Sequence, residues 1–215
     1  MKKIRLGIIG AGGIVARVMK DMHRLENVEV TAIAARDLKR AQAVAEQYQI
    51  PHAYGSYLEL AKSSEVDLAY IATPHNFHAE QAMMLMRHGK HVICEKPMAL
   101  NPIQVQQMID CARENGVFLM EAMWTRFLPV MAEIKKVITA GVIGDVLYME
   151  SQFITSDYDI SNIDALVYNY CIHYSTVSNN ELPPISGSLS SCTRCDTGWN
   201  IVVGTLSFSS KKLAP

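Results

Sequence analysis

The stretch IRLGIIGAGGIVARVMK, residues 4–20, joins a short apolar run to a helical pattern through a cluster of glycines. The apolar run predicts a buried strand that ends where the glycines begin. Glycine permits a tight turn and the close backbone approach of a pyrophosphate, and a following helix directs free N–H groups at the phosphates. The stretch therefore predicts a dinucleotide-binding loop. The residues that we expect to bind the cofactor there are Gly10, Gly12, Gly13 and Ile14.

Strand and helix patterns alternate along the next hundred residues. Strands are predicted at 4–9, 28–34, 68–72, 91–95 and 117–122, and helices at 14–25, after Asp37, at 76–88 and after Asn101. In the first helix, spacing predicts that Ile14, Val18, Met22 and Leu25 face the core. Asp37 and Asn101 are expected N-caps, the latter followed by Pro102. This rhythm is typical of an α/β fold with a doubly wound parallel Rossmann sheet.

Composition excludes several classes of protein. The chain has 215 residues, a formal net charge of −1 and no apolar run near the roughly 18 residues of a membrane helix. We therefore expect neither a nucleic-acid nor a membrane partner. Five scattered cysteines do not make a disulfide framework and indicate a reducing cytoplasm. The basic start resembles a signal peptide, but the glycines that interrupt its apolar stretch favour a first strand.

The residue at the end of the second strand determines which cofactor is expected. NAD sites usually carry an acidic residue there, whereas this chain reads Ala34-Ala35-Arg36-Asp37. An arginine can hold a 2′-phosphate and stack on adenine, so Arg36 favours NADP, with NAD possible. The alternative is that Arg36 is solvated and Asp37 only a helix cap. The same absence of an acidic residue speaks against an S-adenosylmethionine methyltransferase.

Two further segments follow strands and are expected at the same edge of the sheet. The first is 73–78, with Thr73, Pro74, His75 and His78, and the second is Glu95-Lys96-Pro97. A lysine there can donate to a substrate oxygen and stabilise developing alkoxide charge, although a plain surface lysine is the alternative. The two histidines lack a carboxylate or cysteine partner nearby, so we expect cofactor contact or helix capping and no metal.

Six segments together resemble one known family. They are GIIGAGG (7–13), AARD (34–37), YGSYLELAK (54–62), IATPHNFH (71–78), CEKPMALN (94–101) and FLMEAMWTRFLP (118–129). The combination is similar to the glucose–fructose oxidoreductase / inositol dehydrogenase (Gfo/Idh/MocA) family, nearest its dimeric dihydrodiol dehydrogenase and xylose dehydrogenase branch. The likeness runs from residue 4 to about 155.

The resemblance implies an NAD(P)-dependent dehydrogenase that acts on a sugar, a polyol or a trans-dihydrodiol. It implies that Lys96 positions the reacting oxygen and that the full-length members are homodimers. The residues that it implies at the cofactor are Gly10, Gly12, Gly13, Arg36, Thr73, Pro74, His75, His78, Glu95, Lys96, Pro97, Trp124 and Arg126.

The chain changes character near residue 150. All 12 methionines lie at or before Met149, and 12 of the 15 serines follow residue 150. A change to strand-rich structure or a damaged reading frame would each produce this shift. We therefore expect a Rossmann domain at 1–122 and an incomplete substrate and dimerisation domain at 123–215. The latter would be a partial α+β domain with an open, mostly antiparallel sheet.

The second part matches the family less well. The family carries a proton-transferring Tyr or His on a helix after a glycine-rich stretch, and that stretch is not found here. Tyr170 is the best match to the tyrosine and His173 the second choice, with plain packing of a partial core as the alternative for both. A shortened sheet leaves unpaired edges, so we expect an unstable last third and a weaker case for a dimer. The alternative function is a cofactor-binding but inactive member of the family.

The second part also contains two cysteines at a spacing seen in zinc sites. This lone pair, Cys192-Thr193-Arg194-Cys195, does not complete a zinc site.

Overall fold

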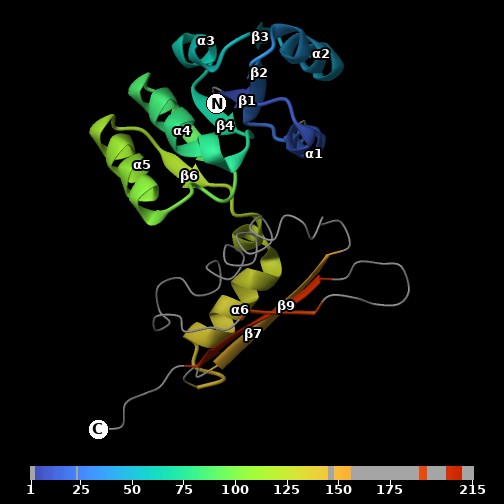
Figure 1. Ribbon diagram of the computed structural model, residues 1–215, viewed down its shortest axis with the longest axis vertical. Coiled ribbons are helices and arrows are strands. Elements are labelled where there is room, and N and C mark those ends of the chain that lie inside the picture. The colour runs from blue at the N-terminus through green and yellow to red at the C-terminus, as the bar shows by residue number, and fades with distance from the viewer. Residues whose placement is uncertain (1–2, 23, 145–147, 156–188, 193–201, 210–215) are drawn as a thin grey trace. The chain divides into compact units, whose positions relative to one another are not determined.

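The computed structural model describes residues 3–22, 24–144, 148–155, 189–192 and 202–209 (Figure 1). The chain forms two compact units, Met1–Ala122 and Met123–Pro215. Within the described ranges, no helix is long and apolar enough to span a bilayer.

The first unit is a doubly wound α/β sheet, as predicted. Its six parallel strands run in the order β3-β2-β1-β4-β5-β6, with helices on both faces (Figure 1). The strands are β1 (Ile4–Ile9), β2 (Val28–Ala34), β3 (His52–Tyr54), β4 (Leu68–Ile71), β5 (His91–Cys94) and β6 (Leu119–Glu121). The helices are α1 (Gly13–Met22), α2 (Leu38–Tyr48), α3 (Tyr57–Lys62), α4 (His78–Arg87) and α5 (Pro102–Glu114), with a 3₁₀ turn η1 (His75–Phe77).

Two hydrophobic cores lie on opposite faces of this sheet. Successive strand residues point to opposite faces, so Ile8 and Ile33 join one core and Ile9 and Ile71 the other. Helices α1 and α2 cover the first face, whereas α3, α4 and α5 cover the second. The sheet is therefore buried on both sides, and its polar chemistry is confined to its edges and strand ends.

The expected helix ends are confirmed where capping residues mark them. The Asp37 side chain accepts a hydrogen bond from the Lys39 N–H (2.9 Å), and Asn101 accepts one from the Gln104 N–H (2.9 Å). These bonds satisfy N–H groups that have no partner inside the helix. Both helices therefore start where the sequence predicts.

The inward face of α1 agrees with the prediction in part. The buried residues are Val15, Val18 and Met19, and Ile14 and Met22 are partly buried against the same core. Leu25 follows the helix and is exposed. The helix begins at Gly13, one residue earlier than expected, and its inward face is wider than the predicted one because it includes Val15 and Met19.

The second unit contains an antiparallel sheet, which agrees with the sequence-based fold class. Its described elements are η2 (Trp124–Phe127), α6 (Pro129–Thr139), β7 (Tyr148–Thr155), β8 (Leu189–Cys192) and β9 (Val202–Ser209). The strands run in the order β7-β9-β8, with both pairs antiparallel. Tyr170 and His173 lie outside the described residues, so their predicted roles stay predictions.

Candidate active site

The carboxyl ends of four parallel strands are aligned in register. Ile9 pairs with Ala34 on one side and Ile71 on the other, and Ile71 pairs with Cys94. The backbone ladder continues one residue further, because the Gly10 N–H donates to the Ala34 carbonyl (2.9 Å). The next residues therefore lie along one edge of the sheet.

This alignment fixes the order of the predicted site residues. Across the edge from β2 to β5 come Arg36, the glycine loop, Thr73 and Lys96. Neighbouring strands are about 4.8 Å apart, so the carboxyl ends of β2 and β5, which precede Arg36 and Lys96, are about 14 Å apart. The site is thus elongated, with a cationic residue at each end and a glycine loop between them. In open α/β sheets, ligands bind at this edge.

The glycines of the loop have two different tasks. Gly10 has φ = 106°, and a Cβ there would lie 2.7 Å from the Ala72 carbonyl oxygen. Apart from the adjoining backbone, no atom of the described residues lies within 4 Å of a Cβ placed at Gly12 or Gly13. Gly10 therefore lets β1 and β4 approach each other, whereas Gly12 and Gly13 leave space beside the start of α1. A phosphate group fits such a space, where helix N–H groups face outward.

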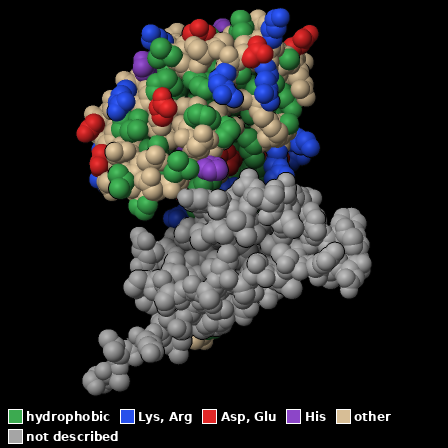
Figure 2. All heavy atoms as spheres, in the orientation of Figure 1, with side chains coloured by type: hydrophobic (Ala, Val, Ile, Leu, Met, Phe, Trp, Pro, Cys, Tyr) green, Lys and Arg blue, Asp and Glu red, His purple; other side chains and the backbone are tan. Residues whose placement is uncertain are grey.

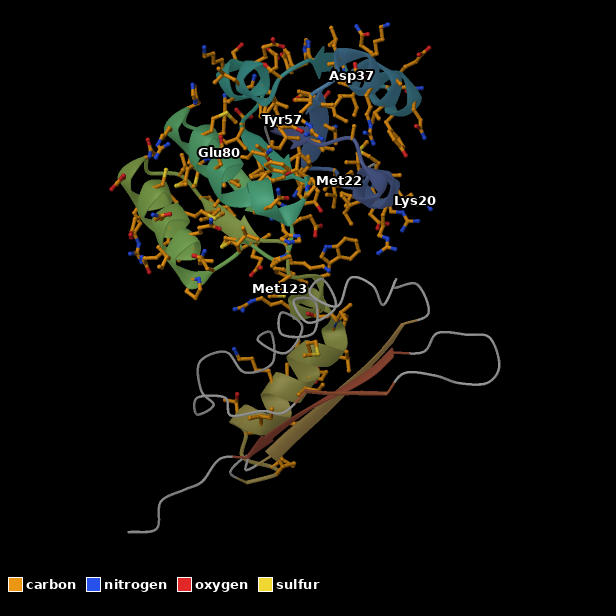
Figure 3. The ribbon with its side chains drawn as sticks, viewed as in Figure 1. Lys20, Met22, Asp37, Tyr57, Glu80 and Met123 are labelled. Carbon is orange, nitrogen blue, oxygen red and sulfur yellow. The ribbon has the colours of Figure 1, made fainter. Side chains whose placement is uncertain are left out.

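Two adjoining pockets lie beside the glycine loop. The first has a volume of about 390 Å³ and is lined by the loop, Arg36 and Arg40 among others. The second, about 320 Å³, includes Phe77 and Met84. The residues that line both are Arg36, Tyr57, Thr73 and Pro74. Tyr57 from α3 and Glu80 from α4 are marked in Figure 3. One pocket thus carries positive charge and the other is more apolar.

Arg36 connects the two pockets. Its guanidinium carbon lies 6.0 Å from the centre of the Phe77 ring, within the range of a cation–π contact. Arg40, one helical turn further along, lines the first pocket and was missed in the sequence. Its spacing of four residues from Arg36 was the available signal, because such a spacing at a helix start can bring two side chains together.

His78 is buried rather than exposed to a cofactor. Only 1% of it is accessible, and its ring nitrogens lie 2.8 Å from the Thr73 and Pro97 carbonyl oxygens. Burial lowers the pKa of His78, whereas the two carbonyl contacts act in the opposite direction. The structure therefore gives His78 a different role from the predicted cofactor contact, which is to connect two strand-end loops.

The other residues of the loop after β4 are positioned by local contacts. The Thr73 hydroxyl donates to the Gln81 Oε1 (2.5 Å), which fixes the loop on α4. Pro74 lines both pockets, and His75 begins the turn η1. Thr73 and Pro74 therefore lie at the pockets, and their contact with a cofactor stays a prediction.

The lysine turn after β5 is held by buried polar groups. Glu95 is 5% exposed and accepts hydrogen bonds from the Tyr70 hydroxyl and from the Lys96 N–H (3.2 Å). The Lys96–Pro97 peptide bond is cis. Glu95 thus uses its carboxylate inside the protein, whereas the sequence interpretation assigned it to the cofactor.

The charge state of Lys96 is tuned by its surroundings. Burial lowers the pKa of Lys96, the Glu95 carboxylate partly offsets this, and the Arg17 cation lowers it further. An ammonium group with a lowered pKa is a better proton donor than a free lysine. Lys96 can therefore donate a hydrogen bond or a proton to a substrate oxygen.

The remaining predicted residues are placed less fully. Trp124 and Arg126 lie in η2 of the second unit, and their cofactor roles stay predictions. Among the described residues, no cluster of three or more His, Cys, Asp or Glu side chains could hold a metal ion. On the face of the first unit that Figure 2 shows, acidic and basic side chains are interspersed, so no broad basic surface occupies that face.

Comparison with known proteins agrees with this geometry. The model of an oxidoreductase family with an NAD-binding Rossmann fold, Gfo/Idh/MocA, matches residues 4–123. A trans-1,2-dihydrobenzene-1,2-diol dehydrogenase from Mus musculus is 44% identical over 162 residues, covering 74% of this chain and 48% of its own. The Danio rerio enzyme of the same name is 38% identical, covering 98% of this chain and 66% of its own.

Solved structures show the same fold. KijD10, a 3-ketoreductase from Actinomadura kijaniata solved with NADP and TDP-benzene, is 32% identical with a TM-score of 0.63. The match covers 68% of this chain and 46% of that one. The WlbA dehydrogenase from Bordetella pertussis, at 23% identity, has a TM-score of 0.74 over 90% of this chain and 63% of its own, which shows the fold.

The chain spans about half the length of the curated relatives that it matches most strongly. The family match nevertheless covers more than half of this chain, including the glycine loop and the lysine turn. The chain therefore belongs to the Gfo/Idh/MocA oxidoreductase family, whose nucleotide-binding part has the Rossmann fold.

Proposed function

We propose that this chain is an NADP-dependent dehydrogenase that oxidises a hydroxyl-bearing carbon, with a trans-dihydrodiol as the first candidate substrate and a sugar or polyol as the second. The observation that carries the proposal is the common edge at which Arg36, the glycine loop and Lys96 follow one another. The names of the dihydrodiol dehydrogenase relatives support the substrate class.

The residues at this edge fit a dinucleotide. The open space at Gly12 and Gly13 suits the pyrophosphate, while Arg36 and Arg40 suit a 2′-phosphate. The neighbouring pocket with Phe77 suits the adenine. NAD remains possible because the glycine loop would bind its pyrophosphate equally well. It is the second choice because it has no 2′-phosphate for the two arginines. When bound, the nicotinamide supplies hydride acceptance and donation.

Lys96 takes the catalytic role in this proposal. Its ammonium group would hold the substrate oxygen by a hydrogen bond and stabilise the negative charge that develops on that oxygen. Tyr170, with His173 as the second choice, would carry the hydroxyl proton away. Trp124 and Arg126 would border the cofactor and the substrate.

Turnover distinguishes this proposal from the alternative of an inactive, cofactor-binding family member. The purified chain is titrated with NADPH and NADH by nicotinamide fluorescence and then assayed for NADP reduction with trans-dihydrodiols, xylose and polyols. Binding with turnover supports the dehydrogenase. Binding without turnover on any of these substrates supports the inactive member, and no binding of either cofactor contradicts both.

Arg36→Ala should raise the Kd for NADPH about 10- to 100-fold, because a charge-assisted contact with the 2′-phosphate is lost. The Kd for NADH should change by less than about threefold, since NADH lacks that phosphate. Lys39→Ala is the matched control, because Lys39 is an exposed cation three residues further along, in the first turn of α2, and lines neither pocket. Equal losses for NADPH and NADH would contradict the assignment of Arg36.

We also propose a cytoplasmic location. Cys94 and Cys111 are free and buried, which suits a reducing compartment. A homodimer is the state that the family resemblance implies, and sedimentation of the purified chain tests whether this chain forms one.

A further inference from the structure

We propose that Tyr70 is a positioning residue for Lys96, and that it acts through the buried carboxylate of Glu95. Tyr70 lies on β4, one strand away from the lysine turn, and has no place in the cofactor pockets described above. The inference rests on the proposed function only in giving Lys96 a catalytic task. The contacts among Tyr70, Glu95 and Lys96 are observed in the structure of this chain and do not depend on the proposed function.

Burial makes the contact between Tyr70 and Glu95 important. Tyr70 is 4% exposed and Glu95 5% exposed, and the tyrosine hydroxyl donates to Glu95 Oε1. A carboxylate removed from water must be stabilised by donors, and a bond from a hydroxyl to an anion is stronger than one between neutral groups. The hydroxyl therefore holds one oxygen of the Glu95 carboxylate in place in a nearly dry environment.

The same carboxylate holds the backbone of the lysine turn. Glu95 Oε2 accepts from the Lys96 N–H (3.2 Å), and Glu121 Oε1 accepts from the Met98 N–H (2.8 Å). Pro97, between them, has no N–H to donate. The Lys96 and Met98 N–H groups therefore both donate to carboxylates. Of these two carboxylates, the one of Glu95 also accepts from the Tyr70 hydroxyl.

A second carboxylate lies near Glu95. Burial raises the pKa of Glu121, and the negative charge of nearby Glu95 raises it further. Glu121 accepts from the Met98 N–H, so each of the two carboxylates has its own backbone donor in the lysine turn. The Tyr70 hydroxyl adds a side-chain donor that holds the other oxygen of Glu95.

A shift of the Glu95 carboxylate would reach Lys96 directly. Glu95 raises the pKa of Lys96 against burial, while Arg17 from α1 lowers it. Other titratable groups that interact with Glu95 in the described part of the chain include Cys94 on β5, Glu121 on β6 and His78 on α4. Removing the Tyr70 hydroxyl releases one oxygen of the Glu95 carboxylate, so the negative charge is held less firmly beside Lys96. The change should therefore act in the same direction as removal of the Glu95 charge, and leave more Lys96 as the free amine.

Acetylation of Lys96 in the full chain tests this without requiring turnover. The rate of labelling by acetic anhydride is measured by mass spectrometry between pH 7 and 10, because only the free amine reacts. Tyr70→Phe and Glu95→Gln should each raise the rate at pH 7.5 at least about threefold, which corresponds to a fall of about 0.5 in the pKa of Lys96. The double variant should react like Glu95→Gln alone, because both changes act on one charge.

Tyr54→Phe is the matched control. Its hydroxyl is bound to Ser63 Oγ (2.9 Å) in a different part of the sheet, so the labelling rate of Lys96 should stay within about 1.5-fold of the unmodified chain. Equal rates in Tyr70→Phe and Tyr54→Phe would overturn the proposal, as would multiplying effects in the double variant. Should Tyr70→Phe fail to fold, an unchanged rate in the isosteric Glu95→Gln overturns it.

The outcome is separable from that of the proposed function. NADPH binding is measured on the same samples by fluorescence. A chain that shows the labelling pattern but binds no NADPH contradicts the proposed function and leaves the link between Tyr70 and Lys96 standing. A chain that binds NADPH but lacks the pattern contradicts only the link.

Discussion

Lys96→Met should lower kcat for dihydrodiol oxidation about 10³-fold, within the range that loss of a positioned hydrogen-bond donor to a developing negative charge produces. The Kd for NADPH should change by less than about threefold, because the side chain acts on the substrate oxygen and not on the phosphates. Steady-state kinetics and fluorescence titration give the two numbers. Lys62→Met, at an exposed position in the last turn of α3, is the control and should retain full activity.

The pH dependence of kcat/KM provides a second check on Lys96. Burial lowers the pKa of this group below the ordinary 10.5, so its active ammonium form is lost as pH rises through that lowered value. The alkaline limb of the profile should therefore lie below the pH expected for a free lysine. Glu95→Gln should move this alkaline limb to a still lower pH, since the carboxylate raises the pKa of Lys96.

For the first of these two predictions, retention of more than about a tenth of kcat in Lys96→Met would contradict the assigned role of Lys96.

Much of the first unit could be predicted because its signals are local. Strands β1 and β2 have the predicted bounds, since each is long enough for its apolar pattern to be unambiguous. The caps at Asp37 and Asn101 are also local, because each side chain binds an N–H two or three residues away. By contrast, β3 and α3 have three and six residues, too few for a periodicity to be recognised.

The candidate site was predictable in its chemistry but not in its supporting contacts. Glycines, Arg36 and Lys96 have properties that depend on residue type and on position after a strand. The Glu95 carboxylate is bound by Tyr70, 25 residues away, and the His78 ring by Pro97, 19 residues away. Spacing cannot show whether a polar residue after a strand points into a pocket or into the protein. The family resemblance, which assigned both residues to the cofactor, does not contain these contacts either.

The glycine loop gives the second large effect. Gly10→Ala should lower the free energy of unfolding by about 2–5 kcal/mol, because a positive φ strains any side chain and the new Cβ meets a carbonyl. The nearest atom, the Ala72 oxygen at 2.7 Å, belongs to the backbone of the neighbouring chain segment and cannot rotate away. Thermal or urea unfolding, followed by circular dichroism, measures the loss.

Gly12→Ala should affect binding rather than stability. Its Cβ meets no atom within 4 Å in the described part of the chain, apart from the adjoining backbone, so the free energy of unfolding should change by less than about 1 kcal/mol. The methyl group would occupy the space proposed for the pyrophosphate, so the Kd for NADPH should rise at least about 100-fold, a loss of about 2.8 kcal/mol. Gly12 would then be a binding residue and Gly10 a folding residue within one short loop.

Gly116→Ala separates backbone strain from loss of the site. Gly116 also has a positive φ, 64°, but it follows α5, and nothing lies within 4 Å of its Cβ. The variant should lose about 1 kcal/mol of stability and bind NADPH as the unmodified chain does. A Gly12→Ala protein that is stable and still binds NADPH with unchanged affinity would contradict the phosphate site. A fully stable Gly10→Ala protein would instead contradict the close approach of β1 to the segment after β4.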